Sequence, residues 1–245
     1  MSEYDLISKI KDINEFVESF KKLLSIENNI EIRSSYQAGS TSIVCDCKNN
    51  KWILIYYPND PIFLLIHELG HLYLTQITKC IYFAKQPPSN TDEEIFSYVN
   101  SIVDEIVNYK LSRYEEIYPY FVNYIEYVFY RTGNGINIKD LQFPLSFYIE
   151  YYLELNFNLN TSELKTLKPR IQRFLDDYEH QLVRDRILDK KDLPPIKNML
   201  ENFSDYLENE TSTTFIYCII KILKGLKKWS SGFINKNIKS IFHLK

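Results

Sequence analysis

The sequence predicts an α+β protein, in which a small three-stranded sheet and one buried helix precede a mainly helical C-terminal half. Runs rich in Ile, Val, Tyr and Thr, separated by turn residues, occur between residues 30 and 57. Apolar residues recur at helical spacing before and after that region. With 245 residues, 45% of them hydrophobic and 25% charged, the chain is long enough and apolar enough to bury a substantial core.

The N-terminal elements follow from hydrophobic periodicity. Residues 4–25 are expected to form an amphipathic helix, because their apolar residues repeat every three or four positions. Three strands are expected next, at 30–36, 41–47 and 51–57. Asn49 and Asn50 form a plausible hairpin turn between the last two strands.

The next two helices are marked by their first residues. Pro58 and Pro61 end the sheet, and a helix is expected over 61–79 because proline suits a first helical turn. After a loop, the residues from Thr91 to Glu94 resemble a capping box that opens a helix reaching about residue 114.

Beyond Pro119 the pattern is helical almost to the end of the chain. Interruptions are expected at 133–135, at 156–161, and at Pro194 and Pro195. The sequence therefore predicts a small α+β unit over 1–115 and a helical region over 116–245 that packs on it.

One short motif carries chemistry: residues 67–71 read His-Glu-Leu-Gly-His inside the helix expected over 61–79. Residues four apart lie one turn above each other, so the imidazoles of His67 and His71 can reach one metal ion. Glu68 can take a proton from a water bound to that metal without being a ligand itself. Two core histidines beside a coincidental glutamate are the alternative, but buried imidazoles need polar partners. The motif therefore favours a Zn²⁺ site with one position open to water.

The motif and its setting resemble the zincin metallopeptidases, which place such a helix behind a small sheet. The resemblance implies that His67 and His71 are metal ligands and that Glu68 is the general base. It does not extend to the C-terminal half. No histidine follows His71 before His180, so the third histidine of the metzincin branch is absent. The resemblance therefore implies a carboxylate as third ligand on a following helix, as in the gluzincin branch.

Asp104 is the preferred third ligand. It lies in the middle of the expected helix, with Asn100 and Asn108 one turn before and after it. A polar stripe beside an apolar face is costly unless it meets polar groups. A metal ligand supported by two amides would account for the stripe, whereas the alternative is a solvated helix face.

Three other carboxylates remain candidates for the same role. Glu93 and Glu94 lie at a common gluzincin spacing from the second histidine, but Glu94 is also accounted for as a helix cap. Glu105 follows the preferred ligand directly and is the least favoured of the four.

Three other features of the sequence give further predictions. The strand over 51–57, or its partner, is expected to pair with an extended peptide substrate, as zincin edge strands do. Cys45 and Cys47 would share one strand face, where packed thiols are a simpler explanation than a second metal site. His180 could stabilise an oxyanion, although a surface histidine beside acids is the simpler interpretation.

The charge distribution is uneven. Seven lysines and no acid lie between Thr211 and Lys245, so the formal net charge of −3 leaves −10 on residues 1–210. This balance predicts no nucleic-acid partner. The basic segment over 215–228 is either a helix that contacts an anionic membrane surface weakly or the last core helix with a solvated lysine face. The acidic start has no signal-peptide pattern, which predicts a cytoplasmic protein.

The sequence thus predicts a Zn²⁺-dependent metallopeptidase that acts on a peptide or protein substrate. The metal would be held by His67, His71 and Asp104, and Glu68 would act as the base. Two alternatives stay open: a non-catalytic binding protein on the zincin scaffold, and a regulatory protease specific for one protein partner. An intact Glu68 speaks against a purely structural site.

Overall fold

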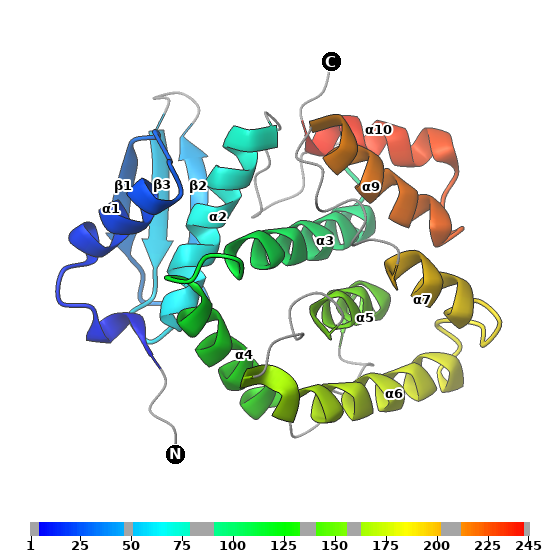
Figure 1. Cartoon of the computed structure of the whole chain (residues 1–245). Helices are drawn as coiled ribbons and strands as arrows, with labels where there is room; N and C mark the ends of the chain where they lie inside the picture. The colour runs from blue at the N-terminus through cyan, green and yellow to red at the C-terminus, as the bar shows by residue number, and fades with distance from the viewer. Residues whose placement is uncertain are drawn as a thin grey trace. The chain divides into compact units, whose positions relative to one another are not determined.

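The computed structural model describes residues 5–46, 51–78, 91–132, 141–155, 163–201 and 212–242. Within these residues a small sheet is followed by a largely helical remainder, which confirms the predicted α+β fold (Figure 1). The strands are β1 (Ile30–Ser34), β2 (Ser42–Asp46) and β3 (Lys51–Tyr56). The helices are η1 (Ile7–Lys9), α1 (Ile13–Leu23), α2 (Ile62–Thr78), α3 (Glu93–Leu111), α4 (Tyr118–Thr132), α5 (Pro144–Leu153), η4 (Glu163–Thr166), α6 (Lys168–Arg184), α7 (Leu193–Glu201), α9 (Ser212–Gly225) and α10 (Ser231–Ile241).

The described chain divides into two compact units. The first comprises Met1–Gln86 and Lys110–Tyr130, and the second comprises Pro87–Tyr109 and Arg131–Lys245. The boundary falls inside α3, so this helix contributes residues to both units. In the described part of the chain, every helix is too short or too polar to cross a lipid bilayer.

The sheet of the first unit has the strand order β1-β3-β2. Strand β3 pairs with β1 in parallel and with β2 in antiparallel register, so both of its edges are occupied. The strand over 51–57, one of the two strands expected to pair with a substrate, is therefore the central strand. It has no open edge in the described sheet, so the prediction is wrong for β3. Its partner β2 is an edge strand in the described sheet. The expected turn at Asn49 and Asn50 lies outside the described residues.

The first predicted helix, 4–25, is interrupted. Residues 7–9 form the 3₁₀ helix η1, and α1 begins only at Ile13. The cause is Asp12, whose carboxylate accepts hydrogen bonds from the backbone N–H groups of Asn14 and Glu15 at 2.9 and 3.0 Å. A side chain that caps these amides starts a new helix rather than continuing the preceding one.

Helix α2 lies at the centre of the first unit and is within one residue of the predicted 61–79 at each end. It packs against β2, β3 and α1. The ring of Phe63 contacts Phe121 and Tyr124 of α4, with centroid separations of 5.3 and 5.1 Å. Because neighbours surround it, α2 is apolar around most of its circumference, and any polar side chain on it must be satisfied inside the protein.

Helix α3 begins one residue later than a cap at Thr91 requires. The carboxylate of Asp92 accepts from the backbone N–H of Ile95 at 3.0 Å and so caps the helix. The hydroxyl of Thr91 donates instead to Ser240 at 3.0 Å, and Glu94 forms an ion pair with Lys228. The predicted capping box is therefore wrong in detail, because its two members contact α10 and the connection between α9 and α10 instead.

The core of the second unit is built from α3 and the helices after α4. Tyr148 of α5 stacks on Tyr178 of α6, and Ile171 and Leu175 of α6 are fully buried. The predicted interruption at Pro194 and Pro195 is wrong, because both prolines lie in the first turn of α7, where the missing N–H removes no helical bond. The interruptions expected at 133–135 and 156–161 lie outside the described residues.

Candidate metal centre

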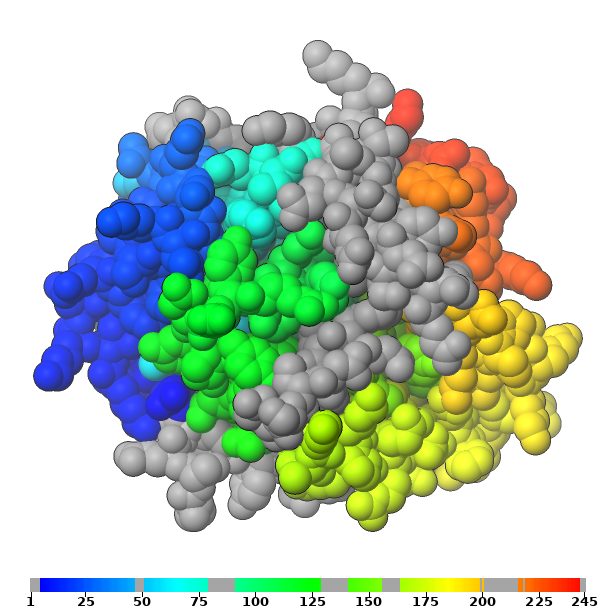
Figure 2. Space-filling view, viewed as in Figure 1, coloured from blue at the N-terminus to red at the C-terminus, as the bar shows by residue number. Residues whose placement is uncertain are grey.

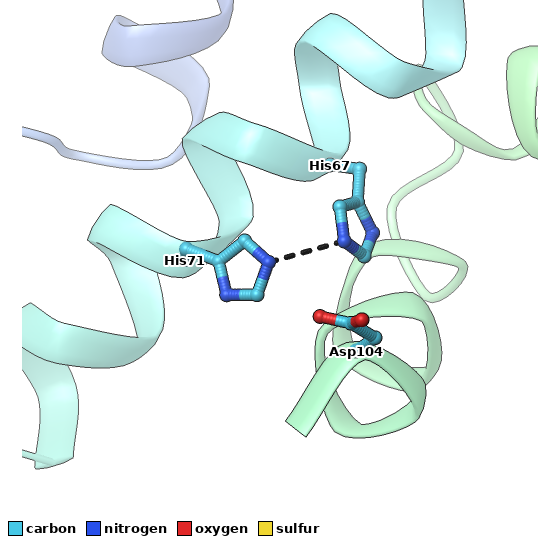
Figure 3. A group of neighbouring side chains, drawn as sticks. All are labelled: His67, His71 and Asp104. Atoms are coloured by element: carbon cyan, nitrogen blue, oxygen red, sulfur yellow. Dashed lines mark hydrogen bonds between the residues drawn. The ribbon is translucent and has the colours of Figure 1, made fainter. Parts of the chain in front are cut away.

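The two histidines of the motif face each other on consecutive turns of α2. His67 is 9% exposed and His71 is 4% exposed, so both rings are buried. Their Nε2 atoms are 3.1 Å apart, and the rings meet edge to face with centroids at 4.8 Å (Figure 3). The helical spacing accounts for this geometry, since residues four apart project toward one place.

Asp104, on α3, completes a group of three potential ligands. The ligand atoms of His67, His71 and Asp104 all lie within 4.8 Å of one another. Figure 3 shows the carboxylate directed toward the two imidazoles. The second carboxylate oxygen, Oδ2, accepts a hydrogen bond of 2.7 Å from the amide Nδ2 of Asn100, one turn earlier in α3. A carboxylate fixed by a neighbouring amide is the usual arrangement around a metal ligand.

The donor set fits a divalent metal ion. Two nitrogens bound at about 2.05 Å to a tetrahedral Zn²⁺ lie about 3.4 Å apart. The observed separation of 3.1 Å between the two Nε2 atoms is close to that value. Two imidazoles and one carboxylate are also a ligand set of catalytic zinc sites, whereas Ca²⁺ and Mg²⁺ favour oxygen ligands only. The group can therefore bind a metal ion.

The side chain of Glu68, the residue after the first histidine, is held by the sheet. It is 9% exposed, and its Oε2 atom accepts a hydrogen bond of 2.8 Å from the backbone N–H of Ile43 in β2. This N–H donates to a side chain of α2 and not to the paired strand β3, which places it at the outer edge of β2. The carboxylate of Glu68 thus lies at the edge of the sheet.

The other carboxylates proposed as third ligand have different surroundings. Glu93 is exposed at the start of α3, and Glu94 pairs with Lys228. Glu105 is buried inside the second unit, where Asn108 donates from Nδ2 to its Oε1 at 3.2 Å. Asn108 also donates to Oε2 of Glu154 at 3.5 Å. Of the four candidates, the structure brings only Asp104 together with the histidines.

Sequence reasoning missed the hydrogen-bond donor to Glu68 and the two acids that lie near Glu105. The backbone N–H of Ile43 carries no side-chain signal, so no pattern could have pointed to it. Glu150 and Glu154, which lie close to Glu105, could have been found, because two acids one turn apart interrupt an otherwise apolar and aromatic segment around α5.

The weaker site predictions have separate outcomes. His180 is exposed on α6. Cys45 is half-buried in β2, and Cys47 lies outside the described residues. In the basic segment, α9 has a buried apolar face that contains Ile219, Ile222 and Leu223. Its Lys221 and Lys224 are exposed. Helices α9 and α10 form the orange and red surface in Figure 2.

Burial, followed by the neighbouring carboxyl of Glu154, raises the pKa of Glu105 well above its ordinary value of 4.5. When the pKa of a carboxyl group is higher in the folded state, the protein has its full stability at pH values below the unfolded-state pKa of 4.5. That stability is lost as the pH rises toward the folded-state pKa. The free energy of unfolding should therefore fall by up to about 1.4 kcal/mol per pH unit in that range.

We expect Glu105→Gln to remove most of this pH dependence, because the amide keeps the shape of the neutral acid and does not ionise. Urea denaturation of both proteins between pH 5 and 8, with chelator present, measures the effect. Equal slopes of unfolding free energy against pH would show that Glu105 titrates as an ordinary glutamate.

Comparisons of the chain with protein-family models, with curated proteins and with solved structures find no match. The function of the site therefore has to follow from the chemistry of its own residues.

Proposed function

We propose that the protein is a zinc-dependent metallopeptidase with Glu68 as its general base. One observation carries the proposal: two buried imidazoles and a carboxylate converge, and the glutamate that directly follows the first of these histidines is buried as well. Gathering these groups away from water is costly unless a cation compensates the charge and occupies the nitrogen lone pairs. A site that only stabilised the fold would need no glutamate next to its first ligand.

Each residue has a separate role in this proposal. The Nε2 atoms of His67 and His71 and one carboxylate oxygen of Asp104 would hold the ion, and Asn100 would keep the aspartate oriented. Zn²⁺ held there would supply Lewis-acid polarisation of a carbonyl group and would lower the pKa of a water molecule that it binds.

Glu68 performs the proton transfers. Its carboxylate accepts a proton from the attacking water and then delivers that proton to the nitrogen of the leaving amine. The hydrogen bond from Ile43 fixes Oε2, so the side chain does not have to be ordered again during each turnover. Hydrolysis of a peptide bond requires a group that takes a proton from water and then gives it to the leaving nitrogen. Glu68 can do both, so a peptide bond suits this site as the substrate.

The substrate would bind as an added strand along β2. This strand is at the edge of the described sheet, and its outward N–H at Ile43 lies at the Glu68 carboxylate. An extended peptide paired with the outer edge of β2 would therefore run past the metal ligands with its backbone held by main-chain hydrogen bonds. Pairing of this kind recognises the extended main chain of a substrate more than any particular side chain.

Protein purified without chelator is expected to contain about one zinc ion per chain and to cleave an unfolded protein substrate such as casein. Elemental analysis and mass spectrometry of the digest measure the two properties. Chelation should stop cleavage, and added zinc should restore it. A metal-free protein that also fails to bind added zinc would contradict the metal centre, whereas a zinc-loaded protein that cleaves no extended peptide would indicate a binding protein on this scaffold.

A further inference from the structure

The hydrogen bond between Ile43 and Glu68 joins two elements that are far apart in sequence. Its length of 2.8 Å and its buried position depend on how β2 lies along α2. A strand advances by about 3.3 Å per residue, and neighbouring residues direct their N–H groups to opposite edges. A displacement of β2 along its axis by one residue would therefore carry the N–H of Ile43 out of hydrogen-bonding distance of Glu68.

A second buried carboxylate fixes that placement. Asp60 lies in the connection from β3 to α2 and is 6% exposed. Its Oδ2 accepts from the hydroxyl of Thr41 at 2.6 Å and from the backbone N–H of Thr41 at 3.4 Å. Its Oδ1 accepts from the N–H of Gly39 at 3.1 Å, where a φ of +67° suits glycine. The aspartate therefore binds the segment that leads into β2.

The hydroxyl of Thr41 makes a further link. While it donates to Asp60, it accepts a hydrogen bond of 3.2 Å from the backbone N–H of Tyr57, directly after β3. One hydroxyl thus connects the start of β2, the end of β3 and Asp60, two residues before α2. Ile43 lies two residues after Thr41, and Glu68 lies in the second turn of α2.

We propose that Asp60 and Thr41 are positioning residues for Glu68: their hydrogen bonds hold β2 against α2 so that the N–H of Ile43 meets the general-base carboxylate. The proposal rests on the proposed function only in so far as Glu68 is the base. Neither residue belongs to the group of metal ligands, and both act through the backbone of β2.

The test uses the zinc-loaded full chain and four variants. Thr41→Val removes the hydroxyl but leaves both backbone donors on Asp60, so it disturbs folding least. Thr41→Ser keeps the hydroxyl and should behave as wild type. Glu68→Ala removes the acceptor of the Ile43 N–H. Thr78→Val is the matched control, because it makes the same substitution at a threonine whose hydroxyl donates to the backbone of its own helix at 2.7 Å.

Hydrogen exchange of the Ile43 amide, followed by NMR, reports the bond without any need for peptidase activity. We expect Thr41→Val and Glu68→Ala each to reduce protection of this amide about tenfold. Thr41→Ser and Thr78→Val should leave it unchanged. Unaltered protection in Thr41→Val, or equal losses in Thr41→Val and Thr78→Val, would overturn the proposal.

Kinetics then separate this proposal from the proposed function. If the wild type cleaves peptides, Thr41→Val should lower kcat about tenfold or more with KM and zinc content unchanged, because only the base is misplaced. A rise in KM alone would overturn the positioning role. A wild type with no peptidase activity would remove the proposed function, whereas the exchange result for Ile43 would still decide whether Asp60 and Thr41 place Glu68.

Discussion

Replacing Glu68 by Gln is expected to abolish peptide hydrolysis while zinc remains bound. Glutamine has nearly the same shape as glutamate and can still accept the hydrogen bond from Ile43, but it cannot take up a proton at neutral pH. General-base catalysis contributes about 10²–10⁴-fold to such reactions, so kcat should fall by at least about 100-fold. Zinc content by elemental analysis and cleavage rates on a fluorogenic peptide measure the two effects.

The matched control is Glu126→Gln, which makes the same chemical change at an exposed position of α4. It should retain wild-type activity and wild-type zinc content. If Glu68→Gln lost its zinc together with its activity, Glu68 would be a ligand or would be needed to form the site. If the variant kept full activity, another group would be the base.

Replacing a metal ligand should have the second large effect, on zinc affinity. We expect His67→Ala and Asp104→Asn each to weaken zinc binding by more than about 100-fold, because the first removes a ligand and the second replaces a charged oxygen by a neutral one. Asn100→Ala should cost about 10–100-fold, since this amide orients the Asp104 carboxylate. Competition with a chromophoric chelator measures the affinity of each variant.

Two further variants serve as controls in this series. Glu94→Gln should keep its zinc and lose only the ion pair with Lys228, and Asp177→Asn changes an exposed aspartate of α6. Loss of zinc in Glu94→Gln together with retention in Asp104→Asn would move the third ligand to the first turn of α3. Asn108→Ala is expected to act mainly on stability, because Asn108 donates to Glu105 and Glu154.

Prediction of the elements succeeded where local signals agreed. Helix α2 has a continuous apolar segment with proline just before it, and the structure places both of its ends within one residue of the prediction. The first helix was predicted too long, because its apolar period continues across Asp12 while the Asp12 side chain caps a new helix. Periodicity reports which side chains are buried, whereas a cap depends on a single hydrogen-bonding side chain.

The sequence located the three strands close to their observed positions. It did not predict their order in the sheet. Composition identifies a strand through its branched and aromatic residues, which fit a pleated surface wherever the strand lies. The order β1-β3-β2 depends on which segments pair, so β3 became the central strand and β2 became the edge beside Glu68.

The common direction of His67 and His71 follows from their spacing alone, because an α-helix repeats every 3.6 residues whatever surrounds it. The choice among the four carboxylates, and the backbone amide of β2 that holds Glu68, depend on contacts that form only in the folded chain. Those contacts join segments that are distant along the chain. Their formation depends on the summed burial of many side chains from distant segments, and no local pattern of residues records that sum.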